Sequence, residues 1–240
     1  MEGTEKVLLA HSNDEFSSHF SMTLGNCGWG VSCVKSIKEM IKTLESSEDF
    51  FRLVGIPLED IALDEVGSIG EILEEPRFKE TKIFAVIAAS TRFSQVILEK
   101  IKTLKPRDFV SENCTSDEIV FRLNNVLYED NGIRKNYRAL VKMTVHCDYM
   151  QDFFDAESFT ISKDGIFLKT DRTFPADAKI FLTFKLPISQ KDFATMGSLL
   201  YSINDSSPKP RVSPPGSGLY FVDLNNEERD SIDRYVRGSA

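Results

Sequence analysis

Residues 83–89 form an unbroken apolar run, Ile-Phe-Ala-Val-Ile-Ala-Ala. A strand that is apolar on both faces belongs in the middle of a parallel sheet whose two sides are covered by helices. Segments with apolar residues at helical spacing separate this run from four shorter apolar runs, at 6–10, 30–34, 51–56 and 108–110. The alternation predicts a doubly wound α/β domain over residues 1–130.

The pattern changes around Asn131 and Gly132, a pair typical of turns. Beyond it, short β-rich runs follow one another at close spacing, at 140–145, 159–161, 166–170, 179–186 and 219–222. That spacing predicts an all-β barrel or sandwich over residues 131–240. A C-terminal helix is expected to begin at Asn225 or Asn226, because acidic residues follow at once and arginines come near its end.

Charge is distributed unevenly between the two halves. The whole chain has a formal net charge of −8, which argues against a general nucleic-acid binder with a broad basic face. Residues 1–130 carry 14 Lys and Arg against 23 Asp and Glu, whereas residues 131–240 carry 15 against 14. An anionic ligand is therefore expected in the second half, where repulsion is weaker.

Other classes of protein are disfavoured by simple features. No apolar run approaches the ~20 residues that cross a bilayer, and the first residues lack the order of a secretory signal. The four cysteines show no Cys-x-x-Cys spacing, which predicts free thiols and no metal site. We expect a cytoplasmic protein without membrane insertion.

Residues 5–128 resemble the receiver domain of two-component signalling, a flavodoxin-like fold. Receivers phosphorylate an Asp at the end of the third strand, beside magnesium-binding acids after the first strand and a lysine after the fifth. Here His11 follows the first strand, Gly55 takes the place of the acceptor, and Glu112 follows the fifth strand. The resemblance therefore implies a receiver-like domain without phosphotransfer, left to dock an unknown protein partner or to form a homodimer.

Two basic and polar segments of the second half contain the residue types that bind anionic and nucleobase ligands. Arg134-Lys135-Asn136-Tyr137-Arg138 precedes the first β run, and Thr160-Ile161-Ser162-Lys163-Asp164-Gly165 begins 22 residues after it. Arginine can pair with a guanine edge through two hydrogen bonds, stack on a base or clamp a phosphate. The serine offers a hydroxyl, and the glycine permits a tight turn with close backbone approach.

The order and spacing of these segments resemble the RxxxR and (D/N)xSxxG signatures of the PilZ domain, over about residues 132–237. PilZ domains are small β-barrels that bind the bacterial second messenger cyclic di-GMP. The resemblance implies that the ligand contacts Arg134, Lys135, Arg138, Thr160, Ser162 and Gly165. Thr160 departs from the signature, because threonine cannot form the two-hydrogen-bond base pair that Asp or Asn makes. Its loss costs ~1–3 kcal/mol of binding energy.

The resulting hypothesis is a bacterial signalling effector, not an enzyme, that binds cyclic di-GMP and relays it by domain re-orientation or partner docking. The alternative is an interaction or scaffold protein in which both domains have lost their chemistry. Adjacent His146 and Cys147 are expected on opposite faces of a strand, so they do not suggest thiol catalysis. The acidic residues around 152–157 are expected in a solvated loop. An acid that neutralises Arg134 or Arg138 would favour the alternative.

Overall fold

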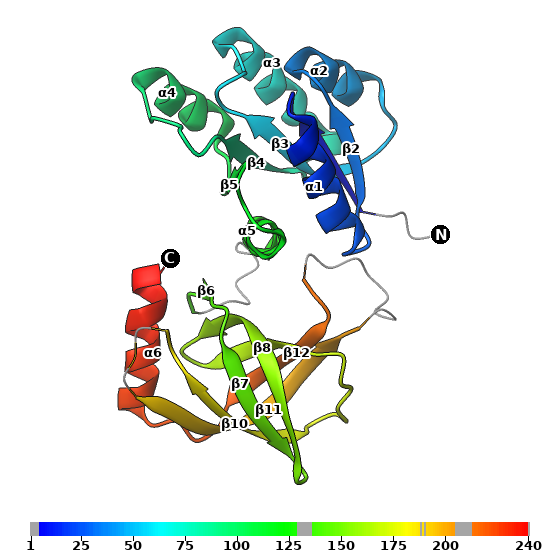
Figure 1. The fold of residues 1–240 in the computed structure, drawn as a ribbon. Coiled ribbons are helices and arrows are strands. Elements are labelled where there is room, and N and C mark those ends of the chain that lie inside the picture. Colours follow the sequence, from blue (N-terminus) through cyan, green and yellow to red (C-terminus); the bar gives the residue numbers. More distant parts are fainter. Residues whose placement is uncertain (1–4, 129–135, 188, 190, 205–212, 240) are drawn as a thin grey trace. The chain divides into compact units, whose positions relative to one another are not determined.

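A computed structural model describes residues 5–128, 136–187, 189, 191–204 and 213–239. Its contacts divide the chain into two compact units, residues 1–130 with 209–213, and residues 131–208 with 214–240. Both are drawn in Figure 1. Within the described ranges, no helix has the length and apolar character needed to span a membrane.

The first unit is built on a parallel sheet of five strands in the order β2-β1-β3-β4-β5. The strands are β1 (Lys6–Ala10), β2 (Gly30–Val34), β3 (Phe51–Pro57), β4 (Lys82–Ile87) and β5 (Phe109–Ser111). This order is that of the flavodoxin-like doubly wound fold, so the sequence-based prediction of the fold class is confirmed. The apolar run at 83–89 supplies β4, which lies between two neighbours as its composition requires.

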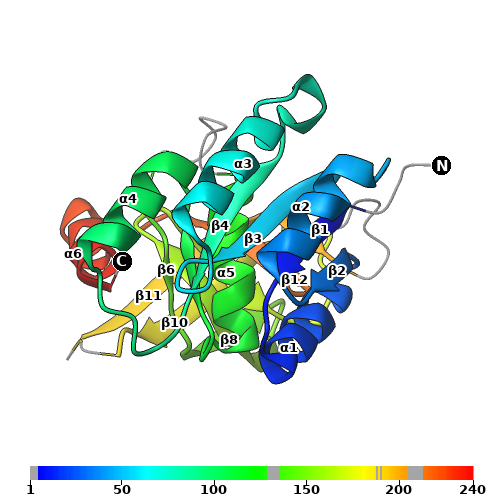
Figure 2. The ribbon, with the colours of Figure 1, turned by 90° about the horizontal axis from the view of Figure 1, so that it is seen from above.

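Helices cover both faces of this sheet. They are α1 (Asp14–Gly25), α2 (Ile37–Ser46), α3 (Leu63–Leu73), α4 (Gln95–Leu104) and α5 (Ser116–Tyr128), with a 3-10 turn at Pro76–Phe78. Figure 2 shows α1 and α5 on one side of the sheet and α2, α3 and α4 on the other. Each helix buries the apolar side chains that recur at helical spacing, such as Ile37, Met40 and Leu44 in α2.

Gly55 does not end its strand. It lies in the middle of β3, paired with Leu9 on β1 and Phe84 on β4. Both partners are fully buried, and a β-carbon at Gly55 would come within 2.7 Å of Phe84 Cε2 and 2.8 Å of Leu9 Cδ1. Sequence analysis was therefore wrong to set this residue at the strand end, where a receiver carries its acceptor. The strand ends at Pro57, which also lacks a carboxylate.

The second unit is an antiparallel barrel. Its strands are β6 (Ala139–Leu140), β7 (Thr144–Tyr149), β8 (Asp152–Ser162), β9 (Gly165–Lys169), β10 (Lys179–Lys185), β11 (Asp192–Ile203) and β12 (Gly216–Phe221). Six of them close a ring in the order β8-β7-β10-β11-β12-β9, because β9 pairs back onto β8. The short β6 pairs with the C-terminal part of β8. This confirms the predicted barrel.

Two parts of the barrel differ from the prediction. Strand β11 was not predicted. Its inward positions alternate large apolar residues with Thr195 and Gly197, which weakens the apolar pattern that marks a strand. Asp152 and Asp155 lie on the first half of β8 rather than in a loop. The exposed carboxylates of Asp152 and Asp155 disguised a strand that contributes Ala156 to the core.

Helix α6 (Asn226–Ser239) follows the last strand, as predicted. Asn225 caps it, since its side-chain oxygen accepts from the backbone N–H of Glu228 at 2.9 Å, and Glu228 accepts from the backbone N–H of Asn225 at 3.2 Å. Ile232 and Val236 on one face of α6 are fully buried in the barrel core. The helix therefore belongs to the barrel and holds its N-terminal turn close to β12.

Candidate ligand site

The turn between β8 and β9 is a two-residue hairpin. Ser162 pairs with Gly165 across it, and the Ser162 hydroxyl donates to the Gly165 carbonyl at 3.3 Å. Gly165 is not in the left-handed region. Its lack of a side chain is required by another strand, because a β-carbon there would overlap with the backbone carbonyl oxygen of Leu219 on β12. The close backbone approach expected at this glycine is thus an approach of the barrel's own β12.

Arg229 on α6 clamps this hairpin. Its guanidinium donates to the carbonyl oxygens of Lys163 (3.3 Å), Phe221 (2.7 Å) and Leu224 (3.2 Å), and to a carboxylate oxygen of Asp164 (3.1 Å). The other Asp164 oxygen accepts from the amide of Asn136. The turn is therefore fixed by one arginine that reaches it from the C-terminal helix.

Arg138 lies beside the same hairpin. Strand β6 begins one residue later and pairs Ala139 with Ile161. Continued by one residue, this antiparallel register sets Arg138 opposite Ser162. Arg138 is half-buried, and its guanidinium makes no hydrogen bond or ion pair within the part of the chain that the structure describes. Arg134 and Lys135, the other basic residues of the motif, lie outside the described residues.

Thr160 sits between β6 and β9. It pairs with Leu140 on one side and Phe167 on the other, and it is 6% exposed. A β-bulge at this point in β8 leaves Phe159 without a partner on β9, so that Phe159 and Thr160 together lie opposite Phe167. The hydroxyl of Thr160 has no hydrogen-bond partner among the described residues. It therefore remains available as a single donor or acceptor.

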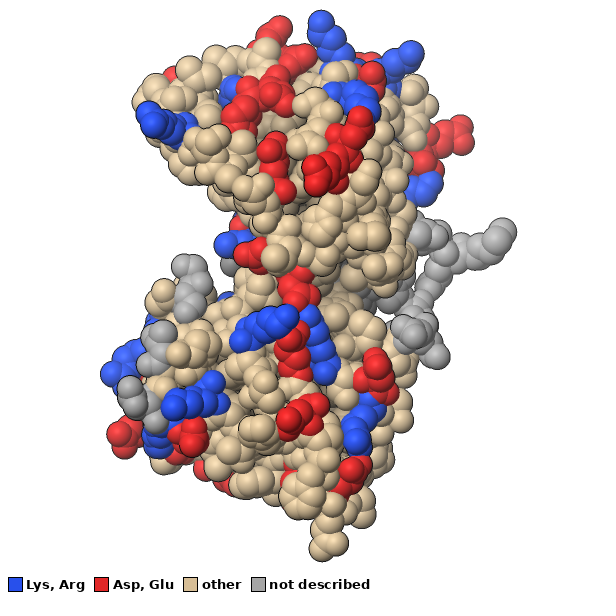
Figure 3. Space-filling view, in the orientation of Figure 1, with Lys and Arg blue, Asp and Glu red and all other residues tan. Residues whose placement is uncertain are grey.

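Among the described residues, three acids of β8 and its hairpin pair with other basic residues. They pair as follows: Asp152 with Arg172, Asp155 with His146 at 2.6 Å, and Asp164 with Arg229 at 3.1 Å. Figure 3 shows acidic and basic side chains interspersed over this face of the barrel. Within the described ranges, none of these carboxylates pairs with Arg138.

Sequence reasoning missed Tyr220. It is opposite Gly165 in the β9–β12 register, and it faces outward because its neighbours Leu219 and Phe221 lie in the barrel core. Tyr220 is 42% exposed, and the Arg229 guanidinium is 5.6 Å from the centre of its ring. Arg138, Ser162, Gly165 and Tyr220 thus form a row across four strand positions. The outward position in the Leu-Tyr-Phe run was the signal that could have identified it.

His146 and Cys147 lie on opposite faces of β7, as the strand alternation predicted. Cys147 is buried in the barrel core, and His146 is exposed and bound to Asp155. Burial, with a smaller contribution from the Asp155 charge, raises the pKa of the Cys147 thiol to about 12. The thiol stays protonated near neutral pH and is a poor nucleophile.

The first unit places an unusual pair where receivers have their acids and lysine. His11, at the end of β1, is buried, and its Nε2 lies 2.9 Å from an oxygen of Glu112, after β5. Its Nδ1 accepts from the backbone N–H of Asn13 at 3.1 Å, which leaves the proton on Nε2, facing Glu112. A histidine and a carboxylate thus occupy the positions where receivers carry carboxylates and a lysine.

The fold and the site define a receiver-like α/β domain followed by a small antiparallel barrel with a basic motif beside a glycine turn. Residues 133–238 match the family model described as PilZ domain. The match confirms the resemblance to PilZ domains given by the two motifs.

Several solved structures are similar to parts of the chain. One is the inhibitor of motility MotI/DgrA of Bacillus subtilis (16% identity, TM-score 0.37), with 44% of this chain and 50% of that chain covered. The chain thus spans half the length of that protein. Another is the chemotaxis protein CheY4 of Vibrio cholerae (15% identity, TM-score 0.44), with 52% and 100% covered. A third is a response regulator of Thermotoga maritima (17% identity, TM-score 0.43), with 52% and 98% covered. The comparison with curated protein sequences returned no match.

Proposed function

We propose that the protein is a bacterial, cytoplasmic signalling effector that binds cyclic di-GMP through its PilZ domain. The ligand carries two phosphates and two guanines, so its recognition needs cations with planar, forked donors. The observation that carries the proposal is the half-buried Arg138, which lies opposite Ser162 and has no acidic partner among the described residues. A half-buried guanidinium without an acidic partner can gain free energy by pairing with an anionic ligand.

Each residue of the motif has a distinct part in this proposal. Arg138, with Arg134 and Lys135, supplies the positive charge and the forked donors. Ser162 and Thr160 offer hydroxyls, and Gly165 sets the shape of the hairpin. Tyr220 adds an exposed ring on which a base can stack.

The relay rests on differential binding. A ligand shifts a conformational equilibrium only by the difference in its affinity for the two states. We propose that cyclic di-GMP favours one arrangement of the segment at 132–138, which re-orients the two domains or changes a docking surface. The receiver-like domain then acts as the platform for a protein partner or a second copy of the chain. Neither domain is assigned a catalytic role.

One observation favours a second candidate, a scaffold that has lost ligand binding. Thr160 takes the place of the Asp or Asn of the signature, and it is 6% exposed. A single hydroxyl there cannot replace the two hydrogen bonds of an amide or carboxylate. The same titration separates the two candidates.

Calorimetric titration with cyclic di-GMP tests the proposal. We expect binding at micromolar or lower ligand concentration, and at least about 100-fold weaker binding by an Arg134→Ala/Arg138→Ala variant, because each lost charged hydrogen bond costs about 1.5–3 kcal/mol. Arg234→Ala, on the exposed face of α6, is the matched control and should bind like the parent protein. Absence of heat and of a thermal shift at high ligand concentration would establish the scaffold instead.

A Thr160→Asn variant is expected to bind cyclic di-GMP more tightly. The amide restores two hydrogen-bonding groups at this position, which is worth ~1–3 kcal/mol, or roughly 5- to 150-fold in affinity. The same titration measures it, with Thr160→Val as the control that removes the hydroxyl at nearly constant shape. If Thr160→Asn binds no better than Thr160→Val, the residue does not contact the ligand.

A further inference from the structure

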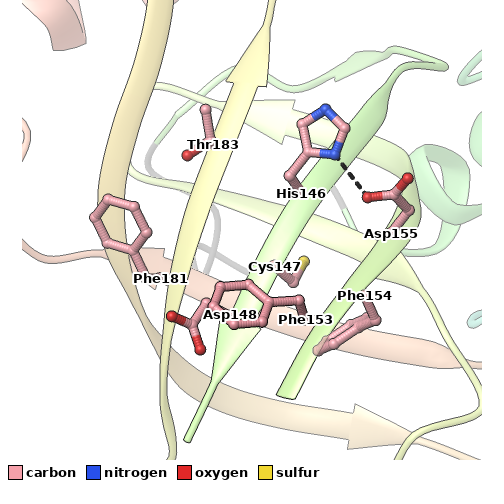
Figure 4. A pocket seen from close by; sticks show the side chains of 8 residues that line it. All are labelled: His146, Cys147, Asp148, Phe153, Phe154, Asp155, Phe181 and Thr183. Atoms are coloured by element: carbon pink, nitrogen blue, oxygen red, sulfur yellow. Dashed lines mark hydrogen bonds and ion pairs between the residues drawn. The ribbon is translucent and has the colours of Figure 1, made fainter. Parts of the chain in front are cut away.

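A groove of about 600 Å³ lies on the outer face of strands β7, β8 and β10. Figure 4 shows the eight side chains that line it. It is distinct from the site beside the β8–β9 hairpin, because Asp155 in the groove and Ser162 at the hairpin are seven residues apart on β8, or about 23 Å along an extended strand.

Aromatic side chains flank a carboxylate in this groove. The register places Asp148 of β7 between Phe181 of β10 and Phe153 of β8, all on one face of the sheet. Figure 4 shows the Asp148 carboxylate between the two rings. Phe153 is 75% exposed and Phe181 is 42% exposed. Two phenylalanines exposed on either side of one residue form an apolar surface, and covering it with a partner is favourable in free energy.

The charge of the groove is negative. Its lining contains two carboxylates and one imidazole, and it contains no Lys or Arg. Asp155 is bound to His146 in the neighbouring row. One oxygen of Asp148 accepts from the backbone N–H of Gln151 at 3.0 Å, and the other has no partner within the described ranges. Asp148, Phe153 and Phe181 all line the same groove.

The barrel already combines these groups around an arginine on the other face of β8. The guanidinium of Arg172 lies 4.1 Å from the ring centre of Phe154 and pairs with the carboxylate of Asp152. Phe153, Phe181 and Asp148 offer the same combination of ring and carboxylate without an arginine. A guanidinium suits it better than an ammonium, since its flat face stacks on a ring while its edge donates to a carboxylate.

We propose that this groove is a docking site for a segment of a partner protein that carries an arginine between apolar residues. The guanidinium lies between Phe153 and Phe181 and pairs with Asp148, and the flanking apolar side chains cover the rings. The complementarity is one of charge and of ring faces. The groove is separate from the proposed cyclic di-GMP site, so the proposal does not depend on binding of that ligand.

Backbone NMR of the full chain, titrated with a defined peptide, tests this inference. The probe is the acetylated, amidated pentapeptide Ala-Leu-Arg-Leu-Ala, and its matched partner has citrulline in place of arginine, which keeps the shape and removes the charge. We expect shifts of the amide signals of residues 146–155 and 181–183 at millimolar peptide, and at least about tenfold weaker binding of the citrulline peptide.

Two aspartate variants locate the effect. Asp148→Asn keeps the acceptor for Gln151 and removes the charge, so we expect at least about fivefold weaker binding of the arginine peptide. Asp192→Asn, an exposed aspartate at the start of β11, is the control and should bind like the parent protein. Equal binding of both peptides, unchanged binding by Asp148→Asn, or no shift of these amides would overturn the proposal. Shifts that depend on protein concentration alone would assign the groove to a second copy instead.

Discussion

Replacing Gly55 with aspartate is expected to unfold the receiver-like domain. The substitution introduces the acceptor residue of receivers, but Gly55 lies in the middle of β3 between two fully buried side chains, Leu9 and Phe84. Even a β-carbon there is closer than 3 Å to both. An unpaired carboxylate in this place adds the cost of a buried charge to that of overpacking, so we expect a loss of about 4 kcal/mol or more.

Tryptophan fluorescence during urea unfolding measures this loss. Trp29 is the single tryptophan of the chain and lies in the receiver-like domain, 5% exposed, so its emission reports on this domain alone. We expect Gly55→Asp to show the emission of an exposed indole without denaturant. A β3 that tolerates the substitution would instead unfold at the parent midpoint, which would contradict the packing around Gly55.

Gly67→Asp is the matched control for this substitution. Gly67 lies in α3, and a β-carbon there meets no atom within 4 Å. Aspartate and glycine differ little in helix propensity, so the free energy of unfolding should change by less than about 0.5 kcal/mol. The contrast separates the local packing at Gly55 from a general intolerance of added charge.

A second large effect is expected at Gly165 in the barrel. A β-carbon there overlaps with the carbonyl oxygen of Leu219, so Gly165→Ala must push β9 and β12 apart where they close the barrel. Overpacking of a rigid backbone costs about 1–3 kcal/mol. We expect a loss near the upper end, about 3 kcal/mol, because the atom that must move belongs to a main chain paired on both sides.

Scanning calorimetry measures the effect on the barrel. A loss of about 3 kcal/mol lowers the unfolding temperature of a domain of this size by roughly 10–20 °C. Trp29 fluorescence identifies the transition of the receiver-like domain, which should not move, so the other transition belongs to the barrel. Gly238→Ala, in the last turn of α6 with open space around it, is the control. If Gly165→Ala behaves like Gly238→Ala, the close approach of β12 is not a constraint in solution.

Gly165 also shows why a motif residue can be interpreted in two ways. Its place in the Ser-x-x-Gly signature suggests a role in ligand approach, and its surroundings show a role in closing the barrel. Loss of ligand binding by a Gly165 variant would therefore follow from either cause. Arg138 and Thr160 give the cleaner tests, because among the described residues no hydrogen bond or ion pair of their side chains joins two strands.

Local periodicity made much of the fold predictable. The apolar run at 83–89, the helical spacing around it and the change of pattern near 131 follow from which faces of an element are buried, and that information is carried by neighbouring residues. The exceptions have the same explanation. Strand β11 buries Thr195 and Gly197, and the first half of β8 exposes acids, so neither has the apolar alternation that marks a strand.

The sequence by itself determined the two fold classes, the order of the elements in the first unit, most strands of the barrel and the motif residues on either side of the β8–β9 hairpin. Only the tertiary structure decided that Gly55 is buried within its strand, that Arg229 fixes the hairpin from 65 residues away, and that Asp148 lies between two phenylalanines. Secondary structure depends on the pattern of nearby residues. Pairing of charges, register across strands and close approach of backbones depend on residues that the folded chain brings together, and a single sequence does not record those pairs.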